Sequence, residues 1–171
     1  TIENLTGGSG ADTLTGNSAA NVLTGGSGAD TLSGDGGNDT LNGDAGNDTL
    51  IGGAGDDALT GGADTDTVTY ASESAAITAS LTAGTASGAG SDTIATVENL
   101  IGGSGADTLT GDASANTISG GADADTLSGA GGNDTLNGDA GNDTLNGGAG
   151  NDTMDGGANT DTVTFAGESA A

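Results

Sequence analysis

Large apolar residues recur at every ninth position over most of this 171-residue chain. An Asp stands two residues before most of them, and Gly-rich sequence precedes each Asp. The first run is Leu5, Leu14, Leu23, Leu32, Leu41, Leu50, Leu59 and Val68, and the second is Leu100, Leu109, Ile118, Leu127, Leu136, Leu145, Met154 and Val163. A repeat this short and regular indicates a solenoid, in which similar units stack on one another.

The nine-residue period favours strands over helices. A helix would hold Gly at many interior positions, each costing about 1 kcal/mol. Segments such as Asp12-Thr13-Leu14-Thr15 instead alternate polar and apolar side chains, as half-buried strands do. Gly supplies the positive φ angles that tight turns need. We therefore predict an all-β fold, a right-handed parallel β-roll (β-solenoid) with two nine-residue repeats in each coil.

A longer repeat of 95 residues lies over the short one. When residues 1–76 are aligned with residues 96–171, 57 of the 76 pairs are identical, which indicates a tandem duplication. We predict β-roll block 1 at 1–69, an irregular β connecting segment at 70–99, block 2 at 100–165 and the start of the next connecting segment at 166–171. Within 70–99 we expect strands near 76–82 and 93–97, in wider coils or in a hairpin that continues the stack. Because the chain starts and stops inside the 95-residue unit, we expect an excerpt from a longer array.

The composition excludes several functions. The chain has 25 acidic residues and no Lys, Arg or His, which gives a formal net charge of −25. Such a chain cannot neutralise phosphates, so we expect no nucleic acid partner. No apolar stretch is long enough for direct membrane insertion, and the lack of Cys excludes disulfides and thiolate metal sites. A polyanion rich in Asp favours a hard cation, and Ca²⁺, as multiple ions, is the predicted partner and cofactor.

The repeated unit is Gly-Gly-x-Gly-x-Asp-x-U-x, where U is large and apolar, as in residues 147–155. This unit resembles the RTX (repeats-in-toxin) nonapeptide of calcium-binding β-rolls, over about residues 5–69 and 100–164. The resemblance implies a secreted, extracellular or cell-surface protein, usually exported by type I secretion, that folds as a β-roll when calcium enters. The family includes toxins, proteases, lipases, adhesins and surface-layer proteins, so the repeat alone does not identify an activity.

Stacked turns would place Asp side chains and backbone carbonyls in the gaps between coils, where they can supply the 6–8 oxygens that calcium takes. Alternate units share an edge, so the predicted columns are Asp12, Asp30, Asp48 and Asp66 beside Asn21, Asp39 and Asp57, then Asp107, Asp125, Asp143 and Asp161 beside Asn116, Asp134 and Asp152. All twelve of these Asp are predicted ligands, with the backbone carbonyls of Gly25, Gly34, Gly43, Gly52, Gly129, Gly138 and Gly147. Roughly ten ions would fill every gap. An Asp can also close a turn without metal, but a column of Asp in a chain without cations favours calcium.

Some units depart from the pattern. Asn21 and Asn116 replace the Asp in matching units, and we expect weak or empty sites beside them because a neutral amide is a weaker ligand. Three fourth positions hold Asp64, Asp123 and Asn159 instead of Gly, and these residue types tolerate left-handed backbone. Four second positions hold Asp35, Asp44, Asp112 and Asp139, which we expect to face water or to add ligands.

No catalytic constellation is present, because a nucleophilic Ser or Thr would need a His or Lys base. We expect no enzyme, but an extracellular structural repeat module, such as a surface-layer, adhesin or matrix-fibre segment, that folds on calcium after secretion. We also expect self-association, or end-to-end continuation in a longer array. One alternative is a calcium-dependent export and folding module of a secreted toxin or enzyme. A third hypothesis is an ice-binding solenoid, because Thr fills most seventh positions of the repeats and several ninth positions. The row at the ninth position is interrupted, for example by Ile51 and Asp155.

Overall fold

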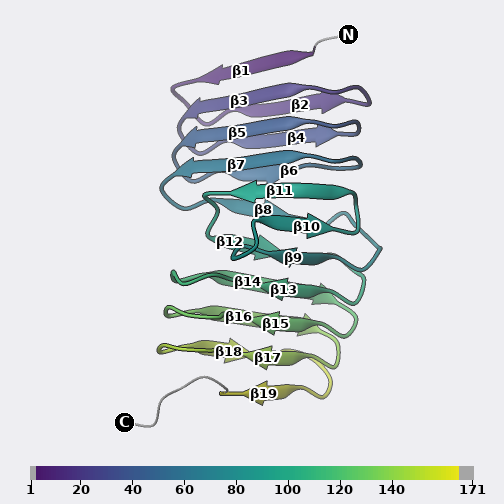
Figure 1. Cartoon of the computed structure of the whole chain (residues 1–171), viewed down its shortest axis with the longest axis vertical. Helices are drawn as coiled ribbons and strands as arrows, with labels where there is room; N and C mark the ends of the chain where they lie inside the picture. Colours follow the sequence, from purple (N-terminus) through teal and green to yellow (C-terminus); the bar gives the residue numbers. More distant parts are fainter. Residues whose placement is uncertain (1–2, 166–171) are drawn as a thin grey trace. The chain divides into compact units, whose positions relative to one another are not determined.

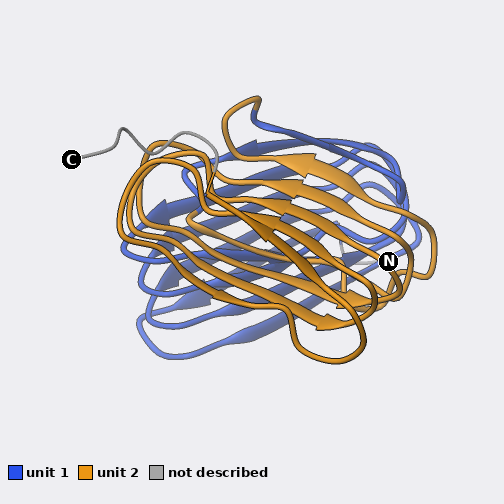
Figure 2. Cartoon of the chain, turned by 90° about the horizontal axis from the view of Figure 1, so that it is seen from below, with its two compact units in different colours: residues 1–69, 84–97 blue, residues 70–83, 98–171 orange. Residues whose placement is uncertain are grey.

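The computed structural model describes residues 3–165, and all regular structure in that range is β-strand. These residues form two compact units, drawn in different colours in Figure 2: unit 1 has the described part of 1–69 with 84–97, and unit 2 has 70–83 with the described part of 98–171. The predicted segment 166–171 lies outside the described residues. Between residues 3 and 165 there is no helix that could cross a membrane.

Unit 1 is built from two sheets joined by turns (Figure 1). The first sheet contains, in spatial order, β1 (Asn4–Gly8), β3 (Val22–Ser27), β5 (Thr40–Ala45), β7 (Ala58–Ala63), β11 (Ser91–Ala95) and β10 (Thr85–Ser87). The second contains β2 (Thr13–Asn17), β4 (Thr31–Asp35), β6 (Thr49–Ile51) and β8 (Thr67–Thr69). Leu5 pairs with Leu23 and Leu23 with Leu41, always in parallel, so each coil contains two nine-residue repeats, as predicted.

Unit 2 has the same construction. Its first sheet contains β9 (Thr78–Ser80), β13 (Thr108–Thr110), β15 (Thr126–Ser128), β17 (Thr144–Asn146) and β19 (Thr162–Thr164). Its second sheet contains β12 (Asn99–Ile101), β14 (Thr117–Ala122), β16 (Thr135–Ala140) and β18 (Thr153–Asp155). Within the unit, these strands pair in parallel. Both units are therefore stacked parallel β-solenoids, and the predicted β-roll fold is confirmed.

The core of each unit is a double column of aliphatic side chains. In unit 1, Leu23 and Leu41 from one sheet and Leu32 and Leu50 from the other are fully buried. Each such side chain contributes roughly 1.5–3 kcal/mol on burial. The Thr residues that flank them point to the outer faces, as the alternation of strand side chains requires. The two sheets thus bury one apolar residue in most repeats, and turns connect the sheets.

Residues 70–99 break the nine-residue period and form three short strands. In unit 1, β11 is parallel to β7, with Ile94 opposite Leu59, and β10 folds back antiparallel on β11. A hairpin therefore extends the first sheet, which was one of the two expected arrangements. In unit 2, β9 is parallel to β13, with Ala79 opposite Leu109. The strands expected near 76–82 and 93–97 are thus present as β9 and β11, while the block boundaries stay a prediction.

Candidate metal centres

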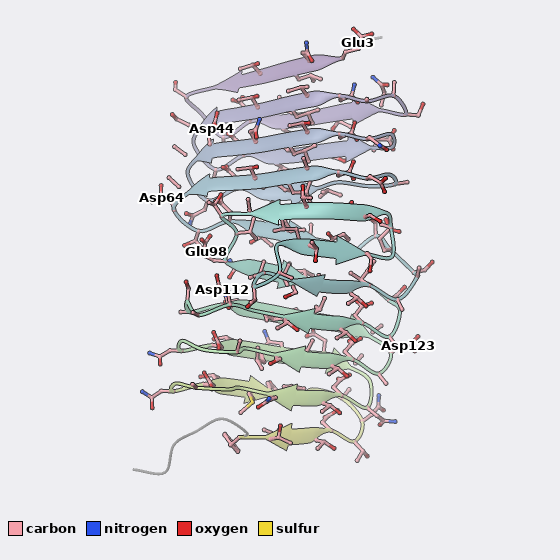
Figure 3. The ribbon with its side chains drawn as sticks, viewed as in Figure 1. Glu3, Asp44, Asp64, Glu98, Asp112 and Asp123 are labelled. Carbon is pink, nitrogen blue, oxygen red and sulfur yellow. The ribbon has the colours of Figure 1, made fainter. Side chains whose placement is uncertain are left out.

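In each nine-residue repeat, the turn ends at the sixth residue, and the next strand begins directly after it. Asp12, for example, lies between β1 and β2, and Asp48 lies between β5 and β6. Figure 3 shows the turns that hold Asp44 and Asp64 at one edge of unit 1, and those that hold Asp112 and Asp123 at opposite edges of unit 2. The turns of alternate repeats therefore stack along the same edge.

Within each column, successive sixth residues are joined by a hydrogen-bond ladder. The backbone N–H of Asp30, for example, donates to Oδ1 of Asp48 at 2.8 Å. The ladders run Asp12–Asp30–Asp48–Asp66 and Asn21–Asp39–Asp57 in unit 1, and Asp107–Asp125–Asp143–Asp161 and Asn116–Asp134–Asp152 in unit 2. The predicted columns are confirmed, and the 18-residue step holds throughout them. The ligand role of these residues is not decided by the ladders and stays a prediction.

Most carboxylates of these columns are buried, and in many of them one oxygen has no hydrogen-bond donor. Asp48 and Asp134 are each only 1% exposed. The oxygen without a donor is Oδ2 in Asp30, Asp39, Asp48, Asp57, Asp125, Asp134, Asp143 and Asp152. A buried carboxylate with an unpartnered oxygen is costly unless a positive charge lies beside it. Since the chain has no Lys, Arg or His, that charge must come from outside the chain.

The first Gly of the nine-residue repeat lets a carboxylate oxygen and a backbone carbonyl oxygen approach each other. A Cβ added to Gly25 would collide with Oδ2 of Asp30 and with the carbonyl oxygen of Gly43, which belongs to the next coil. A Cβ on Gly34 would likewise meet Asp39 and Gly52. Because these glycines do not have positive φ, crowding and not backbone conformation requires Gly here.

The predicted carbonyl ligands occupy this crowded space. The carbonyl oxygens that face the first Gly of the preceding coil belong to Gly25, Gly34, Gly43, Gly52, Gly129 and Gly147. Gly138 is the first Gly of its own turn, and a Cβ there would meet Asp143 Oδ2 and the Gly156 carbonyl oxygen. In several turns a carboxylate oxygen of one coil and a carbonyl oxygen of the next therefore lie beside the same Gly.

Other carbonyls point across the same gaps. The carbonyl oxygens of Gly8 and Gly10 face the α-carbons of Gly26 and Gly28 in the next coil. By contrast, no three acidic side chains within residues 3–165 lie close enough together to hold a metal ion. Carbonyl oxygens and water would therefore complete the coordination of any ion. This all-oxygen set suits calcium, which accepts 6–8 ligands in flexible geometry, better than magnesium, which needs a near-ideal octahedron.

Burial also changes the acid–base behaviour of these carboxylates. It raises the pKa of Asp125 to about 6; the hydrogen bond from the backbone of Asp107 lowers this pKa, and the negative charges of Asp107 and Asp143 raise it. Burial is likewise the largest cause of the raised pKa at Asp39, Asp48, Asp57 and Asp134. A cation beside these groups would favour their charged form.

The repeat sequence has a counterpart among known families. The RTX calcium-binding nonapeptide repeat matches the chain in four copies, at residues 6–41, 33–68, 101–136 and 128–163. The chain belongs to the RTX repeat family. It is therefore a calcium-binding repeat module, and the RTX repeat is a structural repeat. No curated protein matches the chain as a relative.

The departures from the RTX pattern have structural explanations. Asp64, Asp123 and Asn159, which replace the fourth Gly, have φ angles of 79°, 66° and 84°, so the left-handed turn survives as expected. Among the second-position acids, Asp35, Asp44 and Asp139 are exposed to solvent. Asp112 is half-buried and accepts a hydrogen bond from the Ser114 N–H at 2.7 Å, which closes a local turn.

One residue of the RTX columns was missed by the sequence analysis. Asp92 is 2% exposed, and its Oδ1 accepts the backbone N–H of Asp57 at 3.1 Å, so it extends the ladder of Asn21, Asp39 and Asp57. The sequence does contain the signal, because Asp92 stands two residues before Ile94, as Asp does before the large apolar residue in most repeats. It was overlooked because 35 residues separate Asp57 from Asp92 instead of 18.

Proposed function

We propose that this RTX module is an extracellular structural segment, of a surface layer, an adhesin or a matrix fibre, that folds on calcium after secretion. The observation behind the proposal is the set of buried Asp Oδ2 atoms without donors, in a chain that has no cationic side chain. Where calcium is scarce, repulsion among the acidic groups keeps the chain unfolded. Where calcium is millimolar, sites of about 10⁻⁴–10⁻³ M affinity fill, and binding and folding become one event.

Circular dichroism tests the calcium dependence of folding. We expect the strand signal to develop as calcium is added to the chelator-treated chain. Magnesium at the same concentration should be a poor substitute, because it loses its water ligands reluctantly. A strand signal that is complete in excess chelator would contradict the proposal.

The alternative is that the module serves the export and folding of a secreted toxin or enzyme. The calcium chemistry would be the same, so the spectra do not separate the two. The flanking sequence does: a catalytic or toxin domain favours the export module, and further 95-residue units favour the structural array. In either case the module itself acts by folding and not by catalysis.

The structural proposal includes association of copies, or their continuation end to end. In stacked repeats each coil contacts only its neighbours, and an unpaired strand edge can accept another coil. Light scattering at high protein concentration with calcium should therefore show species larger than one chain. A strictly monomeric chain under those conditions would contradict this part of the proposal.

One observation favours a second function, ice binding. In unit 2 the exposed residues Thr78, Thr108, Thr126, Thr144 and Thr162 stand in register along one sheet face. Neighbouring strands lie about 4.7–4.9 Å apart, so the row is regular. The adjacent row is mixed, because Asn146 interrupts its hydroxyl-bearing residues. Thermal hysteresis in the presence of calcium would support this function, and its absence would remove it.

A further inference from the structure

In four turns, one oxygen of the sixth residue's side chain accepts a hydrogen bond from the turn's own backbone. In each, the N–H of the second residue donates to an oxygen of the sixth, at 2.7–2.8 Å. The pairs are Gly8 with Asp12, Asn17 with Asn21, Gly103 with Asp107, and Asp112 with Asn116. None of these second residues has positive φ. We call these four the closed turns.

A second group of turns has the opposite features. Its second residues, Gly26, Asp35, Asp44, Gly53, Gly121, Ala130, Asp139 and Gly148, all have φ between 69° and 109°. The matching sixth residues are Asp30, Asp39, Asp48, Asp57, Asp125, Asp134, Asp143 and Asp152, whose Oδ2 atoms have no donor. We call these the open turns. The sign of φ at the second residue thus sorts with the presence or absence of a hydrogen bond to the side-chain oxygen of the sixth residue.

A rotated peptide explains why the two features go together. The peptide between the first and second residues can turn over, as it does between type I and type II turns, and this changes the sign of φ at the second residue. In a closed turn the N–H of this peptide points at the carboxylate. In an open turn no donor reaches Oδ2, which stays buried and without a partner. Ala130 adopts this strained conformation at φ 73°, despite its Cβ.

In the closed turn of Asp107, both carboxylate oxygens have a hydrogen-bond donor. Asp107 is 2% exposed, and its two oxygens accept the N–H groups of Ile77 and Gly103, both at 2.7 Å. The sequence supports the distinction, because Asn21 and Asn116, the two uncharged sixth residues, both lie in closed turns. An amide oxygen can accept the N–H of the second residue as a carboxylate does.

We propose that calcium enters only the open turns and that the four closed turns, which form the first complete coil of each unit, are held together without metal. This inference rests on the proposed calcium-dependent function. It assigns ions to gaps between consecutive coils of the same unit. Each gap lies between one of the following residues and the next residue of its column: Asp30, Asp39, Asp48, Asp57, Asp125, Asp134 and Asp143. It also removes Asp12 and Asp107 from the ligands predicted by the sequence.

A matched pair of variants tests the assignment. Asp12→Asn alters a closed turn, and Asp30→Asn alters the open turn that follows on the same edge. Bound calcium is counted by equilibrium dialysis, and the calcium midpoint is read from the strand signal. We expect Asp12→Asn to bind as many ions as the parent chain, with an unchanged midpoint. Asp30→Asn should lose at least one ion, and its midpoint should rise roughly tenfold, as when a charged ligand becomes neutral. Equal losses in both variants, or no loss in Asp30→Asn, would overturn the proposal.

The reverse substitution gives an independent test. If Asn21 excludes calcium only because an amide is a weak ligand, Asn21→Asp should gain an ion. If the closed turn excludes calcium, Asn21→Asp gains none, because the Asn17 N–H already occupies the accepting oxygen. A gained ion would refute the proposal, even if Asp30→Asn fails to fold. A parent chain that binds no calcium would instead refute the proposed function, which separates the two failures.

Discussion

At the scale of single residues, the turns require Gly at positions where a Cβ would collide with neighbouring oxygens. Gly25 has no Cβ, and for this reason the Asp30 carboxylate and the Gly43 carbonyl can approach each other beside it. Gly10 lies in a turn of the same unit, yet a Cβ there would meet nothing within 4 Å. A first Gly and a fourth Gly of the repeat can therefore differ in whether a side chain fits there, although both are Gly in the sequence.

This difference predicts unequal effects of adding one methyl group. Gly25→Ala should lower the free energy of unfolding in calcium by about 1–3 kcal/mol, because the new Cβ overpacks the oxygens of the gap. Gly10→Ala, the matched control, should change it by less than about 0.5 kcal/mol. Urea unfolding in saturating calcium measures both. Equal destabilisation by the two substitutions would contradict the crowding argument.

The raised pKa of Asp125, about 6, predicts opposite effects of acid with and without calcium. The folded calcium-free chain binds protons that the unfolded chain, with ordinary Asp pKa values, does not. Its stability therefore rises as the pH falls from 7 to 5. With calcium present, protons compete for the same carboxylates, so the calcium midpoint should increase over this range.

Circular dichroism in chelator and in calcium measures the two effects. The range stops at pH 5 because the isoelectric point is about 4.1, and light scattering checks that association does not produce the signal. A calcium-free strand signal that weakens toward pH 5 would count against the burial of these carboxylates.

At the scale of strands and turns, the sequence predicted what depends on its period. The double column of Leu, the 18-residue register and the grouping of Asp by edge all follow from repeating nine residues twice per coil. The open and closed turns could not be predicted in this way, because Gly8 and Gly26 are the same residue type with different backbone conformations. Asp92 was missed because a hairpin separates it from its column.

The core columns predict a second contrast at this scale. Leu41 in β5 is fully buried, whereas Val22 in the neighbouring β3 is 42% exposed. Leu41→Ala should destabilise the calcium-loaded chain by about 2–5 kcal/mol through lost burial and the cavity left behind. Val22→Ala should have an effect of no more than about 0.5 kcal/mol. Thermal unfolding in calcium compares them, and similar melting temperatures for the two variants would contradict the assignment of the core.

At the scale of the whole molecule, the net charge of −25 opposes the burial of a thin aliphatic core. Both compact units contain columns of buried carboxylates, and neither contains a cationic side chain. Calcium can neutralise these columns only once the turns are stacked, because each gap draws its oxygens from two consecutive coils. Folding and calcium binding are thus expected to be a single equilibrium.

Small-angle X-ray scattering with and without calcium tests this coupling most directly. In chelator the radius of gyration should be at least about 44 Å, the value for an unfolded chain of this length, because charge repulsion adds to chain expansion. Millimolar calcium should contract the chain well below that value, at the same concentrations that bring in its strand signal. A chain that is already contracted in excess chelator, and whose radius calcium does not change, would contradict the account.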